Sequence, residues 1–441
     1  MNMAFFLMRP SGRASSPHRR SALPGLTLGL ALAWVILGQA TVRAADPIPG
    51  QDLASIRAWL VVHNPQLRAL QAEREAAEAR VLPAGALPDP MFSLNLRGID
   101  PDHPSLAPAN VDSTTYAVRQ TFPLWGKRAL ARDVAREQAQ ATGYERDAVE
   151  LELLARAEDA YVRYWHAREA VVVIDRMIGL VRQVEEIAGV RYALGMAAQQ
   201  DSIRAQVEQT TLQQARIERL AARSEAMAAL NAVLGRRADA PLAEPAAAPT
   251  LTVADASSLT EALARVERGS HPELKASASM AAAANRNVTL ERRNRYPDIT
   301  VGVGSMQRGN RVEGYEMMLE VEIPFQQRAR REREREARLR EDAALARSDA
   351  TRDDLEGRLG AAWARWSSAR ERRQLTEKTL LPQSEANFKS AMASYQVGAV
   401  DFGTLLAALS GWQGADLARL DAQRDELLGA AAMRAIDGDI R

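Results

Sequence analysis

The side chains that most often bind metals or carry out catalysis are few and scattered in this chain. There is no cysteine, so the chain has neither disulfides nor thiolate metal ligands. No two histidines are four residues apart, and none lies beside a cluster of carboxylates. These histidines are His18, His63, His103, His166 and His271. Nucleophile elbows, HExxH, phosphate-binding glycine loops and a serine–histidine–aspartate set are also missing from the sequence. We therefore predict no enzyme, no cofactor and no bound metal.

The carboxylates with the most regular spacing lie in the segment 314–323. Glutamates alternate there with apolar residues, which predicts a strand with one wet face. The glutamates on that face are Glu316, Glu320 and Glu322. Of the nearby methionines, Met317 falls on the apolar face, and only Met306 and Met318 remain for a soft-metal relay. Packing within the sheet is the favoured interpretation of both.

Three further segments show the same period-two alternation. They predict strands at about 90–98, 113–122 and 298–307. By themselves, four such strands are equally consistent with a soluble two-sheet protein that has one polar face.

The N-terminus is typical of an export signal. Arg19 and Arg20 precede an apolar run over 26–37, and small residues lead to a cleavage site after Ala44. The alternative is an N-terminal membrane helix, for which the run is short. Removing residues 1–44 and their five arginines changes the formal charge from +1 to −4. A mildly acidic mature chain argues against nucleic acid as a partner.

The remaining sequence repeats itself once. Four landmarks recur in the same order at separations of 201 to 209 residues. They are Asn64-Pro65 with His271-Pro272, Pro88-Asp89 with Pro297-Asp298, Phe122-Pro123 with Ile323-Pro324, and Tyr192-x-x-Gly195 with Tyr395-x-x-Gly398. We predict a first repeat at 45–235, a proline-rich linker or equatorial segment at 236–258 and a second repeat at 259–441.

In each repeat, the predicted order of elements along the chain is helix, strand, strand, long helix, turn, long helix. The first helices are expected at 51–81 and 259–295. Long helices with coiled-coil-like apolar spacing are expected at about 126–194, 198–235, 327–397 and 401–437, the third interrupted only by Pro382. The longest would form rods of roughly 100 Å.

Strands and rods together predict a duct shared between copies. Strands of this length can cross an outer membrane, but lipid does not tolerate open sheet edges. Four strands cannot close a barrel, whereas three copies supply twelve. The glutamate face would then line an acidic interior. The rods are too long for a bilayer and would project into the periplasm.

The sequence resembles the TolC-like outer-membrane efflux proteins over about residues 51–438. The motifs that carry the resemblance are Asn64-Pro65, the run Gln120-Thr121-Phe122-Pro123-Leu124-Trp125-Gly126-Lys127, Tyr192-x-x-Gly195 with Asp201 and Ala205, and Leu230-Asn231-x-x-Leu234-Gly235. The resemblance implies a mainly α fold with a small β part. It also implies a homotrimer whose twelve-stranded membrane β-barrel continues into a periplasmic α-helical barrel.

The resemblance also implies a gate at the helix–turn–helix tips, where the duct would meet its adaptor protein. The residues expected there are Tyr192, Gly195, Asp201, Tyr395, Gly398 and Asp401. Gate carboxylates of some relatives correspond to Thr404 and Ala407, which departs from the family pattern. Simple turn packing is the alternative role for the tyrosines and glycines.

The segment Leu87-Pro88-Asp89-Pro90-Met91, with Gly126-Lys127, looks most like the cation-efflux branch of the family. The expected function is the outer-membrane exit duct of a tripartite pump that exports heavy-metal cations. Its expected partners are a periplasmic adaptor, an inner-membrane resistance-nodulation-division (RND) transporter and outer-membrane lipid. A drug efflux duct, a type I protein secretion outlet and a soluble coiled-coil adaptor remain alternatives.

Overall fold

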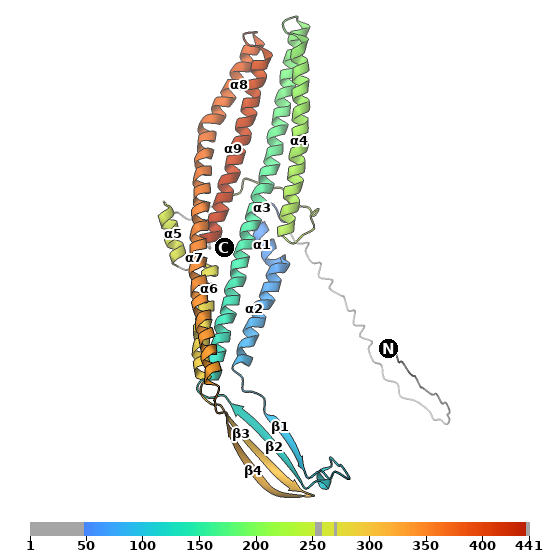
Figure 1. Cartoon of the computed structure of the whole chain (residues 1–441). Coiled ribbons are helices and arrows are strands. Elements are labelled where there is room, and N and C mark those ends of the chain that lie inside the picture. Colours follow the sequence, from blue (N-terminus) through green and yellow to red (C-terminus); the bar gives the residue numbers. More distant parts are fainter. Residues whose placement is uncertain (1–47, 252–257, 269–270, 438–441) are drawn as a thin grey trace, which may run out of the picture. The chain divides into compact units, whose positions relative to one another are not determined.

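The computed structural model describes residues 48–251, 258–268 and 271–437 (Figure 1). The predicted export signal at 1–44 lies outside these ranges, as does part of the predicted linker.

The first repeat begins with two helices where the sequence predicts one: α1 (Leu53–His63) and α2 (Pro65–Ala84). Asn64 separates them with an extended backbone, and its Oδ1 accepts the amides of Gln66 at 2.8 Å and Leu67 at 3.3 Å. Pro65 has no amide hydrogen with which to continue the hydrogen bonds of α1. The prediction of one helix over 51–81 is therefore wrong, because the Asn-Pro pair ends one helix and caps the next.

The second repeat has the same break, between α5 (Leu259–Glu267) and α6 (Pro272–Arg293). Here Nδ1 of His271 accepts the amide of Glu273 at 3.2 Å. The prediction of one helix over 259–295 is wrong for the same reason. The repeated Asn/His-Pro landmark is thus a helix cap in both halves.

The four strands form one antiparallel sheet in the order β1-β2-β3-β4 (Figure 1). They are β1 (Met91–Arg97), β2 (Ser113–Phe122), β3 (Ile299–Arg308) and β4 (Arg311–Val321), and a short 3₁₀ turn, η1 (Pro108–Asn110), precedes β2. The central pair, β2 and β3, joins the two halves of the chain, with Thr121 opposite Thr300. Among the described residues, no further strand pairs with the outer edge of β1 or of β4.

Long helices follow each strand pair: α3 (Lys127–Ala193) and α4 (Gln199–Val233), then α7 (Gln327–Leu375), the π-helical turn η2 (Thr376–Leu380), α8 (Leu381–Gln396) and α9 (Phe402–Asp437). The interruption expected at Pro382 takes the form of η2. A wider π turn just before a proline makes room for the ring, which would clash with the preceding carbonyl in a regular helix. Figure 1 shows α3 beside α4, and α8 beside α9.

The passage from β2 to α3 is held by polar contacts to the second repeat. Trp125 has a φ of +61°, unusual for a residue other than glycine, and its indole donates to the carbonyl of Pro297 at 2.9 Å. Nζ of Lys127 lies 2.7 Å from Oδ1 of Asp298 and 2.8 Å from the carbonyl oxygen of Tyr296. These contacts fix the sheet against the first turn of α3.

The apolar core follows the helices. One cluster lies where the two helical hairpins meet and includes Met177, Leu212, Phe388 and Leu405. A second packs α1 against α3 and α4 around Tyr161. Within the described ranges, no helix combines the length and the apolar character that crossing a membrane requires.

Candidate functional site: the hairpin tips and the polar sheet face

The two turns that join the long helices have the same backbone geometry. Gly195 has a φ of +72°, and the amide of Met196 donates to the carbonyl of Arg191 at 2.8 Å. Gly398 has a φ of +79°, and the amide of Ala399 donates to the carbonyl of Ser394 at 2.8 Å. Glycine adopts this left-handed conformation without strain, which explains its place in both turns.

A contact between the two hairpins lies beside these turns. The hydroxyl of Tyr395, at the end of α8, donates to Oδ2 of Asp201 on α4 at 3.0 Å. The tyrosine is only 2% exposed, and burial followed by this hydrogen bond raises its pKa to about 12. The guanidinium of Arg191 lies 4.6 Å from the centre of the ring, and Phe402 meets the ring edge-on. The two hairpins are therefore joined at their tips by one buried tyrosine.

Tyr192, the counterpart of Tyr395 in the first repeat, is in a different environment. Its side chain is 47% exposed. Asp401 does not join the contact between the hairpins. Its Oδ1 accepts the amide of Thr404 at 2.7 Å, and hydrogen bonding to Thr404 holds the pKa of Asp401 below its usual value. The structure thus brings together only Asp201 and Tyr395 of the four predicted polar residues at the tips.

Arg191 and Phe402 belong to the tip contact, although the sequence analysis did not single them out. Arg191 precedes the Tyr-x-x-Gly motif directly, and the corresponding residue of the second repeat is Ser394. A cation placed over an aromatic face is stabilised by the quadrupole of the ring, but only tertiary structure determines which ring is involved.

The polar face of the sheet carries the predicted glutamates. The strand register places Glu316 opposite Gly304 and Glu320 opposite Thr300, so these residues share one face with Met318. Nη1 of Arg119 lies 3.5 Å from Oε1 of Glu320. Glu322 follows the end of β4, and its Oε1 lies 3.5 Å from Nη2 of Arg330. Two of the three glutamates therefore have an arginine partner.

The opposite face of the sheet is apolar and exposed. Tyr315 is 88% exposed, Met317 82% and Val303 56%. Large apolar side chains in such numbers on one face indicate a surface that meets another apolar phase.

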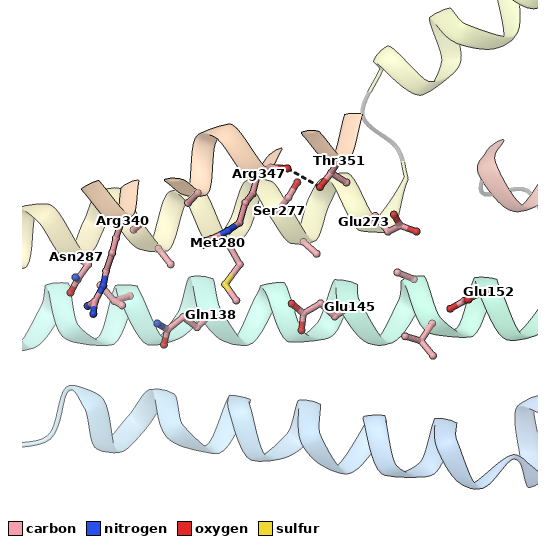
Figure 2. Close-up of a pocket in the computed structure, with 17 residues that line it drawn as sticks. Gln138, Glu145, Glu152, Glu273, Ser277, Met280, Asn287, Arg340, Arg347 and Thr351 are labelled. Atoms are coloured by element: carbon pink, nitrogen blue, oxygen red, sulfur yellow. Dashed lines mark hydrogen bonds between the residues drawn. The ribbon is translucent and has the colours of Figure 1, made fainter. Parts of the chain in front are cut away.

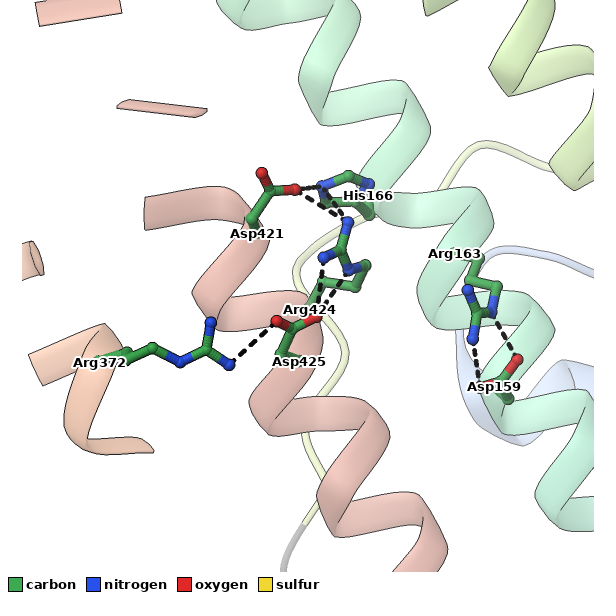
Figure 3. Close-up of polar contacts among 7 residues, drawn as sticks. All are labelled: Asp159, Arg163, His166, Arg372, Asp421, Arg424 and Asp425. Carbon is green, nitrogen blue, oxygen red and sulfur yellow. Dashed lines mark hydrogen bonds and ion pairs between the residues drawn. The ribbon is translucent and has the colours of Figure 1, made fainter. Parts of the chain in front are cut away.

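His166 lies in a polar cluster where α3 and α9 meet (Figure 3). Nε2 of His166 lies 2.8 Å from Oδ1 of Asp421, and Arg424 donates to the same carboxylate at 2.9 Å. Burial lowers the pKa of His166, and the charge of Arg424 adds to this effect. The arrangement is a polar junction between two helices. Nowhere among the described residues do three His, Cys, Asp or Glu side chains gather so as to hold a metal ion.

A groove of about 1000 Å³ lies between α3, α6 and α7 (Figure 2). Alanines share its lining with charged residues such as Glu145 and Arg347. The hydroxyl of Thr351 donates to the carbonyl of Arg347 at 2.9 Å, and that of Ser277 to the carbonyl of Leu274 at 3.0 Å. These hydroxyls are engaged with helix backbone and are not positioned as nucleophiles.

Comparison with known proteins identifies the family. The model of the outer membrane efflux protein family matches residues 60–236 and matches again at 263–439. The chain belongs to the outer membrane efflux protein family. The predicted resemblance is confirmed, and the members and structural relatives of this family are channel proteins and not enzymes.

Individual relatives of this efflux protein agree with the family assignment. The cobalt-zinc-cadmium resistance protein CzcC of Cupriavidus metallidurans is 25% identical over 372 residues, which cover 83% of this chain and 84% of CzcC. The outer-membrane channel OprN superposes with a TM-score of 0.74 at 19% identity, over 88% of this chain and 90% of OprN. CusC superposes with a TM-score of 0.73 at 15% identity, over 88% of this chain and 92% of CusC. These likenesses establish a mainly helical efflux-channel fold with a small sheet.

Proposed function

We propose that this efflux protein is the outer-membrane exit duct of an RND-type tripartite pump. Three copies would form one twelve-stranded barrel that continues into a periplasmic helical barrel. The duct would conduct cargo passively, and heavy-metal cations are the favoured cargo. The observation that carries the proposal is a four-stranded sheet with two free edges and an exposed apolar face.

The free sheet edges support a wall shared between copies. A strand edge in lipid leaves backbone amides and carbonyls without partners, at a cost of several kcal/mol for each group. Pairing β4 of one copy with β1 of the next would satisfy every edge. Twelve strands also enclose a wider interior than the eight of the smallest barrels.

The helices offer free faces at the corresponding edges. α2 packs on α3, α3 on α6, and α6 on α7, so α2 and α7 are the outer members of this layer. The exposed face of α2 carries small residues at heptad-like spacing: Ala69, Ala72, Ala76 and Ala79. α7 carries small residues at multiples of seven: Ala329, Ala343, Ala350 and Gly357. Small side chains allow two helices to approach closely, so α7 of one copy can pack against α2 of the next.

The tips are the proposed gate and the proposed contact with the adaptor. The hydrogen bond between Tyr395 and Asp201 would hold the two hairpins of one copy together when the duct is closed. Tyr192 is exposed, so it is available to a neighbouring copy or to the helical hairpin of an adaptor. Gly195 and Gly398 form the turns, and Asp401 stabilises the start of α9.

The cargo assignment rests on relatives and on sequence. CzcC is by its name a cobalt-zinc-cadmium resistance protein, and it aligns with most of this chain. No metal-holding cluster occurs among the described residues. We therefore expect cations to pass through without a binding site, and the inner-membrane pump would select the cargo.

Deletion of the gene tests the cargo. Cells without it should become sensitive to divalent or monovalent metal ions, and the plasmid-borne gene should restore tolerance. Unchanged metal tolerance would remove the heavy-metal assignment. A loss confined to drugs would indicate a drug efflux duct, and loss of a secreted protein would indicate a type I secretion outlet.

A further inference from the structure

Two glycines of β3 lie on the polar face of the sheet, at Gly302 and Gly304. A Cβ atom on Gly302 would lie only 2.9 Å from Cγ of Arg119 and 3.1 Å from Cε of Met318. A Cβ atom on Gly304 would lie 2.8 Å from Oε1 of Glu316. These distances are shorter than normal contacts, so the glycines leave room for long side chains that lie flat on β3.

Arg119 uses this space to cross a whole strand. It starts on β2 opposite Gly302, passes over β3 and reaches Glu320 on β4, with 3.5 Å between Nη1 and Oε1. The two side chains keep 32% and 51% of their surface exposed. The pair therefore lies on the open surface of the polar face and is not buried within the sheet.

Negative side chains outnumber positive ones on this part of the polar face. Glu316 lies on the same face of β4, four residues before Glu320, and has no ion-pair partner within the part of the chain that the structure describes. Glu322 is matched by Arg330. Arg119, Glu316 and Glu320 together carry one positive and two negative charges, so loss of the arginine would double the net negative charge.

We propose that Arg119 is a specificity-determining residue that sets the balance between cations and anions in the barrel interior, and that Gly302 is the position that accommodates it. The inference rests on the proposed function, in which this face lines a water-filled duct. Without Arg119, this part of the face would bear only the glutamates and would attract cations and repel anions more strongly. Arg119 moderates that preference and leaves the duct permeable to both.

The expected size of the effect follows from Coulomb's law. A unit charge roughly 6 Å away in water changes the local concentration of a monovalent ion about threefold before screening. Cations and anions respond in opposite directions, so their ratio changes by up to about tenfold. Salt at about 0.1 M reduces the effect beyond roughly 10 Å.

The absence of cysteine from the chain permits a direct measurement of the local potential. Thr300 on β3 lies directly opposite Glu320, on the face where the guanidinium of Arg119 meets that carboxylate. Met306 lies on the same face of the same strand, six residues and thus roughly 20 Å further along. Single Thr300→Cys and Met306→Cys variants in outer-membrane vesicles would be treated with cationic and anionic methanethiosulfonate reagents. The ratio of the two reaction rates reports the potential at each cysteine.

In the Thr300→Cys background, Arg119→Ala should raise the ratio of cationic to anionic reaction rates by about threefold to tenfold. Glu320→Gln should lower it, and Arg119→Lys, which keeps the charge, should leave it within about twofold. In the Met306→Cys background, Arg119→Ala should change the ratio much less. An unchanged ratio at position 300 after Arg119→Ala would overturn the proposal. A position 300 that neither reagent reaches would instead overturn the water-filled duct itself.

Discussion

The contact between Tyr395 and Asp201 leads to the sharpest prediction about gating. Tyr395→Phe removes only the hydroxyl that donates to Asp201 at 3.0 Å. A hydrogen bond to a charged group contributes about 1.5–3 kcal/mol, and we take about 1.5 because the half-buried carboxylate can be rehydrated. If the three copies open together, loss of three such bonds amounts to about 4.5 kcal/mol. The ratio of open to closed ducts should then rise about two-thousandfold.

The assay is the conductance of purified protein in planar bilayers, together with cell sensitivity to antibiotics too large for ordinary porins. Tyr395→Phe should raise the fraction of time that the duct is open, and with it the mean conductance and the antibiotic sensitivity, and Asp201→Asn should act in the same direction. The matched control is Tyr192→Phe, because this tyrosine holds the same place in the other repeat but is 47% exposed. It should leave conductance unchanged. Equal effects of the two tyrosine variants, or none from either, would refute the idea that the hydrogen bond between Tyr395 and Asp201 holds the duct closed.

Three further predictions concern stability. Burial lowers the pKa of His166 in the folded protein from its ordinary value of 6.5. The neutral side chain therefore contributes its full stabilisation above about pH 6.5, and this contribution is lost as the pH falls through the lowered pKa. The heat-dissociation temperature of the assembly should therefore fall between about pH 7 and pH 5, and fall less in His166→Gln. Asn64→Ala removes the cap of α2 and the hydrogen bond to the carbonyl of Val233. It should therefore cost about 1–2 kcal/mol of unfolding free energy, measured in circular-dichroism melts. A cost below about 0.3 kcal/mol would contradict the capping role of Asn64. Glu158→Gln leaves Arg57 and Arg434 beside a neutral group at a fully buried site, so it should cost about 3 kcal/mol of unfolding free energy. The control Glu152→Gln, on the exposed surface, should cost at most about 0.5 kcal/mol. Equal costs would contradict the structural role of the buried carboxylate.

Local patterns in the sequence were sufficient to place the strands and the long helices. The alternation that predicted a strand at 314–323 also predicted its faces, and the register puts Met317 and Met318 on opposite sides. The predicted ends of the shorter helices were less reliable. α2 runs beyond the predicted end at 81, through Pro83 to Ala84, and Asn64-Pro65 separates two helices where one was predicted.

Contacts between distant parts of the chain could not be predicted from local patterns. Arg119 and Glu320 are joined across β3, and Arg191 lies over the ring of Tyr395, only because the fold brings the two repeats together. The sequence indicated three similar glutamates at the sheet. The structure distinguishes Glu316, which has no ion-pair partner among the described residues, from Glu320 and Glu322, which have arginine partners.

Disulfide trapping between copies tests the shared wall most directly, since the chain has no cysteine of its own. Leu94→Cys on β1 would be combined in turn with Tyr315→Cys, Met317→Cys and Leu319→Cys on β4, and with Val303→Cys on the central strand β3 as the control. A disulfide requires Cα atoms within about 7 Å. We expect at least one edge pair to yield covalent trimers on oxidation in intact outer membranes, and the control to yield none. Monomers alone from every edge pair would contradict the shared wall.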